Sequence, residues 1–546
     1  MTQILKPRLV SNANGELKTL EIDGKPTILL GGQVHNSTTS SPITMAKAFA
    51  KAKALNYNFV IGSINWNQFE PSEGEFDFGL LEEQIKQAKA NDLKLVLLWF
   101  GAFKNAASTY APTWVRADRR RFPRAKKVEG TAAAWGANQS PVLSLFSDAL
   151  LQADKTAFQA LMGHLRDHDS DHTVVMVQIE NESGLLGSSR DFSEAAQNRW
   201  NSEVPSELIQ GLESQLLQPN DSVTSETWQA AGGKKQGTWV EVFGDSWQAH
   251  EIFMAWHMAT YANAVAESGK AMKDIPMYAN AWLGPQPGQE RAGQWPSGGP
   301  SKNVLGVWKI AAPMIDILSP DIYIQEAFDA MADYARLDNP LFIPESRHIA
   351  GNLFWALGNH AAIGYSMFGG ERGRIGNQMS EAFGVLRECT AFIAKAQAEG
   401  RIQTVVMEKD EMETPLSFGD VTVTAVNSIG KLKRFVEFAG VDLEIKDFEP
   451  THELDDVVVG IPSFSDARPF ALVIQESATE FTLIGKGINL QFSSENCEIE
   501  IDSVHEGSFE NEEWRAVREL NGDERLQFVP LHKISCAKVR ILKFTD

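Results

Sequence analysis

Residues 173–184 read TVVMVQIENESG, an apolar run that ends abruptly in carboxylate and amide side chains. Its β-branched residues predict a buried strand with a polar carboxyl end. Short apolar runs of this kind alternate with amphipathic helical stretches from residue 26 to about residue 375, which predicts parallel strands joined by crossover helices. The eight predicted strands are Thr27–Gly32, Asn58–Ile64, Leu93–Trp99, Thr173–Ile179, Pro276–Ala279, Ile315–Leu318, Leu341–Ile343 and Ala362–Met367. Eight such units in roughly 350 residues predict a (β/α)8 TIM barrel, with a doubly wound open sheet as the alternative.

The pattern changes after about residue 400, where strands separated by turns replace the strand–helix alternation. The predicted strands there are VTVTAV (421–426), DVVVGI (456–461), FALVIQ (470–475), FTLIGKGINLQF (481–492) and AKVRILKF (537–544). We therefore expect an α/β catalytic barrel over residues 1–390, with an N-terminal β-hairpin, and a β-sandwich accessory domain over residues 400–546. A loop insertion at 184–245, rich in Ser, Gln, Gly and Asn, is expected to wall a cleft at the carboxyl ends of the strands.

The composition limits the partners. The chain has 546 residues with 71 acidic and 50 basic side chains, and a surface of that charge repels nucleic acids and anionic membranes. Three cysteines, all late in the chain, are too few for a disulfide framework. We find neither the apolar core of a secretory signal nor a run near the ~20 residues of a spanning helix. We expect a cytoplasmic protein with a neutral ligand, and leave open whether it forms a homodimer.

Polar side chains follow each predicted strand, and in a barrel they line one pocket because parallel strands direct their carboxyl ends to the same face. Glu182 follows the fourth strand and Glu345 the seventh. Two opposed carboxylates suit cleavage of a glycosidic bond: one, with a raised pKa, protonates the leaving oxygen while the other attacks the anomeric carbon. A retaining enzyme holds the two about 5–5.5 Å apart, and an inverting enzyme holds them farther apart. The candidates for contacting the sugar are Gln33, His35, Asn65, Trp66, Asn105, Asn181, Asn280, Trp282 and Tyr323.

Several alternatives remain open from the residues alone. Alternation along a strand turns Glu180 and Glu182 to the same side, so either could be the acid; we favour Glu182 and expect Glu180 deeper in the barrel, paired with a base or hydroxyl. For Glu345 the alternative is a salt bridge to Arg347. The histidines lack metal-ligand spacing and phosphate-binding glycine loops are missing from the strand ends, so we predict no metal and no other cofactor.

Five motifs carry a resemblance to retaining glycoside hydrolases of the (β/α)8 clan: VVMVQIENESG (174–184), WNQFEP (66–71), YAPTWV (110–115), FMAWHMATY (253–261) and IPES (343–346). More narrowly, the chain resembles glycoside hydrolase family 35, the β-galactosidases, in a bacterial branch with a β-rich C-terminal domain. The resemblance implies that Glu182 is the acid/base and Glu345 the nucleophile. It also implies that Asn181 binds the sugar 2-hydroxyl, that Tyr323 hydrogen-bonds the nucleophile, and that Glu70 belongs to a structural loop.

The sequence departs from the better-known members of that family at two places. Ser63 stands where many carry an aromatic residue, and the stretch 103–105 (Phe-Lys-Asn) stands where many carry an acidic residue that grips the sugar; Lys104 is expected to be a solvated or substrate-edge charge. We therefore predict a retaining exo-β-glycosidase, preferably a β-galactosidase that releases terminal galactose from neutral oligosaccharides. The alternatives are a β-glucosidase, β-mannosidase or β-xylosidase of the same clan, or a non-catalytic sugar-binding barrel.

Overall fold

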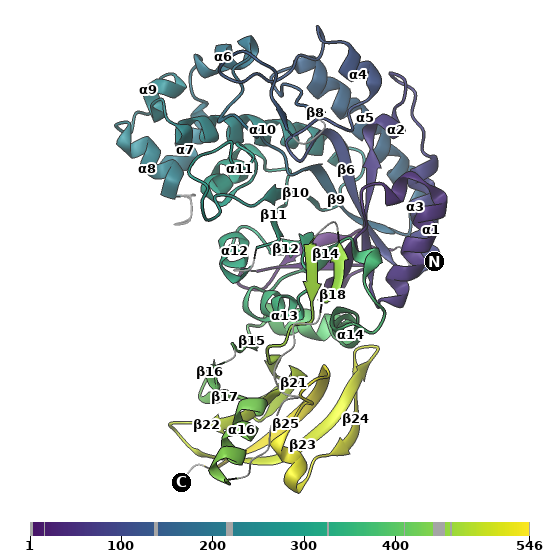
Figure 1. The fold of residues 1–546 in the computed structure, drawn as a ribbon, viewed down its shortest axis with the longest axis vertical. Helices are drawn as coiled ribbons and strands as arrows, with labels where there is room; N and C mark the ends of the chain where they lie inside the picture. Colours follow the sequence, from purple (N-terminus) through teal and green to yellow (C-terminus); the bar gives the residue numbers. More distant parts are fainter. Residues whose placement is uncertain are drawn as a thin grey trace.

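The computed structural model describes residues 4–15, 17–135, 140–214, 222–324, 327–408, 410–440, 454–458 and 461–544. Figure 1 shows a barrel of strands and helices, formed by the chain up to about Ala398, and a group of antiparallel strands near the C-terminus. Within the described ranges, none of the helices combines the length and the apolar character that a bilayer-spanning segment needs.

Parallel strands form a closed barrel, which confirms the predicted (β/α)8 fold and shows that the open-sheet alternative is wrong. The strands are β4 (Leu29–Gln33), β5 (Phe59–Asn65), β6 (Lys94–Lys104), β9 (Val174–Asn181), β10 (Met277–Trp282), β11 (Ile317–Ile322), β12 (Phe342–Ile343), β13 (Glu345–Ser346) and β14 (Gly364–Phe368). Pro344, which lacks an N–H, divides the seventh strand into β12 and β13. Since β12 pairs with β14 and β13 pairs with β11, the two halves of this one strand close the ring.

Helices surround the barrel because each buries one apolar face against the strands. They are α1 (Pro42–Ala54), α3 (Gly79–Ala90), α5 (Asp148–His168), α10 (Trp247–Lys270), α11 (Leu305–Ala311), α12 (Ala327–Tyr334), α13 (Ala350–Asn359), α14 (Gln378–Leu386) and α15 (Thr390–Ala398). Helix α5 is typical: Ser147 caps its first turn by accepting a hydrogen bond from the Leu150 N–H, and Phe158, Leu161 and Leu165 are buried on one face. Short elements in the connections are α2 (Trp66–Phe69), α4 (Thr113–Ala117), β7 (Ala134–Trp135) and β8 (Ser140–Pro141).

The N-terminal end of the barrel is closed by a small antiparallel sheet of β1 (Arg8–Ser11), β2 (Lys18–Ile22) and β3 (Lys25–Pro26). Leu20 and Ile22 of this sheet join the apolar cluster inside the barrel, together with inward residues such as Phe59 and Phe342. The barrel interior is therefore packed from below, and the carboxyl ends of the strands are where a site is expected in this fold.

The described part of residues 184–245 includes four short helices, so the expected loop insertion is helical in part. It contains α6 (Glu194–Trp200), α7 (Ser206–Glu213), α8 (Ser222–Ala230) and α9 (Trp239–Phe243). Leu208, Ile209 and Leu212 bury one face of α7, and a reciprocal Thr238–Glu241 capping box starts α9. The four helices lie at the upper left of Figure 1. Helix α7 contacts α11, α8 and α9 contact α10, and Trp200 of α6 packs against Phe253 of α10.

The C-terminal part is a β-sandwich, as predicted. One sheet contains β15 (Ile402–Val406), β20 (Phe470–Gln475), β21 (Glu480–Lys486), β25 (Ser535–Phe544), β23 (Glu498–Glu510) and β24 (Glu513–Glu519), and the other contains β16 (Glu413–Phe418), β17 (Val421–Asn427) and β22 (Ile488–Ser493). A separate apolar cluster that includes Val423, Val473 and Leu490 lies between them. The predicted strand at 481–492 is in fact two strands, because Gly487 adopts a φ of +66° and sends the chain from one sheet to the other.

The sandwich packs directly on the barrel. Phe470 of β20 lies against Phe354 of α13 with ring centroids 4.7 Å apart, and Leu472 and Ile474 belong to the same apolar cluster as the barrel helices. Of the predicted strand 456–461, residues 459–460 lie outside the described residues; β18 (Leu454–Val458) and β19 (Ile461–Phe464) on either side pair with each other. Helix α16 (Ser428–Phe438) follows β17.

Candidate active site

The strands extend farther than their apolar runs, and this extension builds the site. Strand β10 continues to Trp282 and β11 to Ile322, in both cases beyond the first polar residue, and β6 continues to Lys104, the first polar residue after its apolar run. The last residues of these strands form a polar layer above the apolar interior. Asp321 of β11 pairs in register with Glu345 of β13 in this layer.

Glu345 is buried and held by three neutral donors. Its Oε1 accepts hydrogen bonds from Gln33 Nε2 at 2.9 Å and from Asn181 Nδ2 at 3.4 Å, and its Oε2 accepts one from the Tyr323 hydroxyl at 2.6 Å. The structure therefore brings together four residues that the sequence singled out, from strands β4, β9 and β13 and from the chain just after β11. Three converging donors suit an ionised carboxylate with a fixed orientation.

Glu182 lies at the end of β9 in a left-handed conformation, with a φ of +43°. Its N–H donates to Asn280 Oδ1 at 2.8 Å, and its carbonyl accepts from the Ala106 N–H at 3.2 Å, so both sides of the residue are anchored. Carboxylate oxygens of Glu182, Asp321 and Glu345 lie within 4.8 Å of one another. Burial raises the pKa of Glu182 to about 8, the charge of Glu345 adds to this, and Lys104 and a hydrogen bond with Asp321 oppose it. At neutral pH Glu182 therefore holds a proton, as a general acid must.

Glu180 points away from this site, because its φ of +58° interrupts the regular alternation of the strand. Its carboxylate faces helix α5, where it forms a hydrogen bond with Asp154 and accepts the N–H groups of Ala102 at 3.2 Å and Phe103 at 2.7 Å. The expected partner, a base or hydroxyl in the barrel, is wrong: the partner is a second carboxyl group. Burial raises the pKa of Glu180 well above its usual value, and the neighbouring Asp154 adds to this, so we expect the two carboxyl groups to share a proton. Trp99 Nε1 and the Tyr261 hydroxyl complete the pair by donating to Asp154.

His35 is fixed by a carboxylate of the last barrel loop. Its Nδ1 lies 2.8 Å from Glu371 Oε1, which also accepts the His35 N–H at 3.0 Å and the Thr38 hydroxyl at 2.8 Å, and its ring packs edge-on against Phe368. His35 Nε2 and Gln33 Oε1 are buried and have no hydrogen-bond partner among the described residues. Buried polar atoms of this kind are ready to bind a polar ligand.

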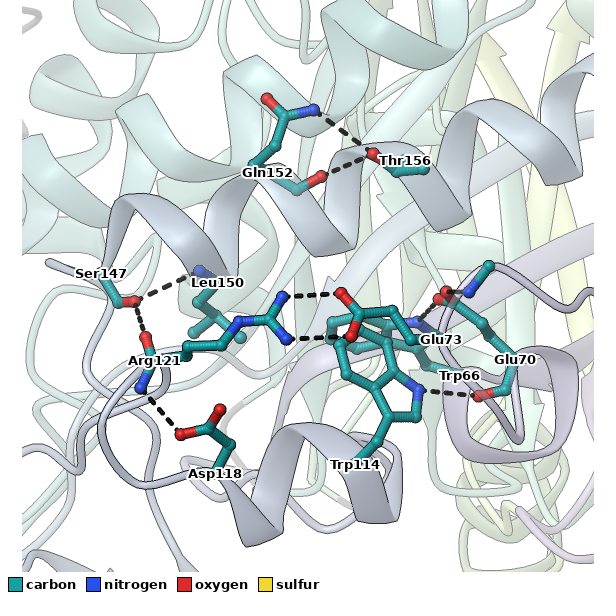
Figure 2. A network of polar contacts seen from close by, with 11 residues as sticks. Trp66, Glu70, Glu73, Trp114, Asp118, Arg121, Ser147, Leu150, Gln152 and Thr156 are labelled. Atoms are coloured by element: carbon teal, nitrogen blue, oxygen red, sulfur yellow. Dashed lines mark hydrogen bonds and ion pairs between the residues drawn. The ribbon is translucent and has the colours of Figure 1, made fainter.

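Trp66 is not a sugar-stacking residue, contrary to the expectation. It is 0% exposed, and Figure 2 shows its indole beside that of Trp114, with both N–H groups donating to Glu70. The Trp66 bond to Glu70 Oε2 measures 2.7 Å, and the other carboxylate oxygen accepts the Gly74 N–H at 2.7 Å. Glu70 thus organises the turn after β5, in agreement with a structural role.

Figure 2 also shows how the neighbouring loop is tied down at the surface. Arg121 donates two parallel hydrogen bonds to Glu73, at 2.9 and 2.6 Å. The Arg121 carbonyl accepts the Ser147 hydroxyl that caps α5.

Asn280 is a positioning group, which corrects its predicted role as a sugar ligand. Its Oδ1 accepts the Glu182 N–H at 2.8 Å and Gln178 Nε2 at 2.9 Å, and its Nδ2 donates to Asp321 Oδ2 at 2.6 Å. These bonds engage both ends of an amide that is only 1% exposed. Asn280 therefore links the backbone of one carboxyl residue to the side chain of another.

Lys104, the last residue of β6, was expected to be a solvated or substrate-edge charge, and the structure shows it partly buried near the carboxyl groups of the site. Lys104 and Ala107 exchange two backbone hydrogen bonds, and the Asn105 N–H donates to the Asn181 carbonyl at 3.0 Å. Asn105 Oδ1 accepts Lys104 Nζ at 2.6 Å, so Asn105 orients the lysine. Burial lowers the pKa of Lys104, and the carboxylates of Glu182, Glu345 and Asp321 counteract that effect.

Two predicted residues lie at the edge of the site. Asn65 Nδ2 donates to Gln68 Oε1 at 2.9 Å, while its Oδ1 is buried without a partner in the described part of the chain. Trp282 ends β10 opposite Asp321 and is partly exposed. The sequence places Asp321 and Lys104 at the ends of predicted strands, but neither was chosen as a candidate for contacting the sugar. Glu371 was missed altogether.

Among the described residues, Glu182, Asp321 and Glu345 are also the one group of three acidic, histidine or cysteine side chains close enough to share a metal ion. Lys104 supplies a positive charge to the same three carboxyl groups. The arrangement thus has its own counter-charge and is suited to proton transfer.

Comparisons with known proteins find β-galactosidases among the similar proteins. Residues 38–288 match a glycoside hydrolase family 42 model described as β-galactosidase, and residues 379–531 match a domain of unknown function, DUF5597. A curated β-galactosidase of Xanthomonas manihotis is 28% identical over 182 residues, which cover 32% of this chain and 27% of that protein. The match therefore spans about a quarter of the relative's length. The family-model match is to family 42 and not to family 35, which the motifs suggested; it contains Glu182 and ends before Glu345.

Two solved structures are similar in outline. A β-galactosidase of Bacillus circulans sp. alkalophilus has a TM-score of 0.48 and 11% identity over 94% of this chain and 99% of that chain. A β-galactosidase of the psychrophilic Marinomonas ef1 has a TM-score of 0.43 and 12% identity over 68% of this chain and 60% of that chain.

Proposed function

We propose that this protein is a retaining exo-β-glycosidase, that Glu182 is its acid/base and Glu345 its nucleophile, and that β-galactosides are its preferred substrates. The observation that carries the proposal is the pair of carboxyl groups whose nearest oxygens lie within 4.8 Å, one with its pKa raised by burial and one held by three donors. Oxygens this close suit double displacement, in which the two carboxyl groups are about 5–5.5 Å apart, better than inversion, in which they are about 6.5–9.5 Å apart.

The reaction proceeds in two balanced steps. Glu345 attacks the anomeric carbon while Glu182 gives its proton to the glycosidic oxygen, so that the bond to the leaving group breaks and a glycosyl ester forms. Glu182, now a carboxylate, removes a proton from water; the water oxygen attacks the anomeric carbon and Glu345 departs as a carboxylate. Tyr323 and Gln33 hold the nucleophile in position through both steps.

Two buried atoms without partners, His35 Nε2 and Gln33 Oε1, support a sugar-hydroxyl site on the β4 side of the mouth. The Asn181 amide, 3.4 Å from Glu345 Oε1, is near enough to the nucleophile to contact the hydroxyl beside the anomeric carbon. The preference for galactose rests on the β-galactosidase description of the matched model and relative. The narrower placement in glycoside hydrolase family 35 rests on the five sequence motifs.

A panel of nitrophenyl β-glycosides tests this proposal. We expect the galactoside to be hydrolysed fastest, with β-galactose as the first anomer seen by proton NMR before mutarotation. Initial α-galactose would refute the nucleophilic role of Glu345, and faster turnover of the glucoside, mannoside or xyloside would refute the sugar preference. Absence of hydrolysis across the panel would favour a sugar-binding barrel.

Two variants test the roles of the carboxyl groups. Glu182→Gln should slow hydrolysis of substrates with poor leaving groups more than that of activated ones. Glu345→Ala should be inactive, and external azide should restore formation of a β-glycosyl azide. The exposed Glu207→Gln on α7 is a matched control that should retain wild-type turnover. Equal activity of all three variants would overturn the assignment.

A further inference from the structure

A third carboxyl group lies between the two in the proposed mechanism. Asp321 is 2% exposed, pairs in register with Glu345, and forms a side-chain hydrogen bond with Glu182. One oxygen from each of the three groups lies within 4.8 Å of the others. The double displacement itself needs only two carboxyl groups, so the third requires its own explanation.

Three carboxylates at this distance do not ionise together, because each negative charge disfavours the next. The charged and titratable groups that act on Asp321 are Glu345 and Glu182, the phenols of Tyr278, Tyr323 and Tyr334, and the ammonium of Lys104. The phenols are neutral, so Lys104 supplies one positive charge and balances one carboxylate. Glu345 has three donors directed at it and takes the negative charge.

The hydrogen bonds of Asp321 agree with a neutral acid. Its Oδ2 accepts Asn280 Nδ2 at 2.6 Å, and its buried Oδ1 receives no hydrogen bond from any donor in the described ranges. An oxygen that carries a proton and faces another carboxylate needs no donor of its own. Asn280 also binds the Glu182 N–H, so the same amide fixes both members of the Asp321–Glu182 pair.

We propose that Asp321 is a positioning residue that keeps its proton throughout the reaction and donates it in a hydrogen bond to Glu182. This inference rests on the proposed role of Glu182. When Glu182 has given its proton to the leaving group, its new carboxylate accepts the Asp321 O–H and faces Lys104. Glu345 loses its charge to the glycosyl ester in the same step, so the cluster keeps one negative charge before and after. Water returns the missing proton to Glu182, and Asp321 has neither gained nor lost one.

Infrared spectroscopy tests the proton directly and needs no substrate. With 13C-carboxyl aspartate incorporated, the wild type near pH 7 should show the carbonyl stretch of a protonated, isotope-shifted acid, since an ordinary aspartate is ionised there. Asp154→Asn identifies the part of this band that comes from the Glu180–Asp154 pair. Asp321→Asn should lose the remaining part, and the exposed Asp92→Asn should retain the whole band. If the wild type shows no protonated aspartate besides Asp154, or if Asp321→Asn leaves the band unchanged, the proposal is wrong. If the band is found but no glycoside is hydrolysed, only the proposed function fails.

Kinetics test the positioning role. Asparagine keeps a neutral donor. Asp321→Asn should lose roughly tenfold in kcat/KM, while the alkaline limb of its profile of kcat/KM against pH stays within about half a pH unit of the wild type. Asp321→Val removes the donor, so its alkaline limb should move up by at least about one pH unit and deglycosylation should slow further. A purely structural role would affect both variants without moving either limb. A fall of the alkaline limb in Asp321→Asn would show that Asp321 is ionised and would overturn the proposal.

Discussion

Replacement of Glu345 by glutamine should lower the pKa of Glu182 from about 8 to roughly 5.5. The two carboxyl groups approach within 4.8 Å. At an effective dielectric constant of about 20, two unit negative charges at this distance repel each other by roughly 3.5 kcal/mol, which corresponds to about 2.5 in pKa. Glutamine removes the charge and keeps the size of the side chain. Loss of a negative neighbour favours the ionised form of Glu182, so the pKa falls, and burial keeps it above the usual value.

The assay is a pH titration of the glutamate carboxyl carbons by 13C NMR. The Glu182 signal is identified by its absence from Glu182→Gln. Glu371→Gln is the matched control: its carboxylate lies at the same mouth but bonds His35 and Thr38, so this variant should leave the pKa of Glu182 near 8. If the pKa of Glu182 in Glu345→Gln stays within about 0.5 of the wild-type value, burial alone raises it, and the reasoning from charge repulsion is refuted.

The same change of charge occurs when Glu345 becomes a glycosyl ester. The free enzyme should therefore lose kcat/KM above about pH 8, where Glu182 loses the proton it must donate. The glycosyl enzyme should turn over down to roughly pH 5.5, since Glu182 must then be ionised to act as a base. One residue serves as acid and base because its partner's charge is present in one step and absent in the next.

Three further predictions follow from the contacts. Trp66→Phe removes the N–H that bonds buried Glu70 and leaves a cavity, so the free energy of unfolding in urea should fall by roughly 2–4 kcal/mol. An unchanged midpoint of urea unfolding would contradict the place of Trp66 in the core. Burial raises the pKa of Glu180 above its unfolded value, so the free energy of unfolding of the wild type should fall as pH rises above about 4.3, by up to about 1.4 kcal/mol per pH unit. Glu180→Gln should show a smaller fall. Equal slopes of stability against pH in the two proteins would refute proton sharing. Tyr323→Phe deletes a 2.6 Å bond to Glu345 and should reduce kcat/KM by roughly 10–100-fold, whereas a loss below about threefold would exclude a role in holding the nucleophile.

The barrel could be predicted because its lower strand residues are uniformly apolar, as buried parallel strands require. The ends of the strands were predicted too early. In β10 hydrophobicity is interrupted at Asn280, where the polar layer begins, and the strand continues to Trp282. In β6 the apolar residues themselves continue past the predicted end at Trp99 to Phe103. The helices of the 184–245 insertion were missed because their polar residues resemble a loop in composition, while a few buried positions such as Leu208 and Leu212 determine the fold.

The buried charge network was beyond the reach of sequence reasoning. Lys104 follows an apolar strand and precedes a turn, where a lysine is usually solvated. Its partial burial depends on the turn between Lys104 and Ala107 and on hydrogen bonds from the Asn105 and Ala106 N–H groups to the carbonyls of Asn181 and Glu182. Contacts between residues about 75 positions apart in the chain have no local signal in one sequence.

Two left-handed residues explain why three consecutive polar side chains of β9 reach three different partners. In a regular strand, Glu180 and Glu182 would share one face and Asn181 would take the other. Positive φ angles at both glutamates break this rule, each at a cost of roughly 1–2 kcal/mol. Glu180 then turns outward to Asp154, while Asn181 reaches Glu345 and Glu182 joins Asp321. The hydrogen bonds to Ala102, Phe103 and Asn280 offset the strain. The Glu180–Asp154 pair therefore stabilises the backbone conformation that keeps the side chains of Glu180 and Glu182 apart. Glu180→Gln should disturb the geometry of Glu182 less than Glu180→Ala, which removes both acceptor oxygens.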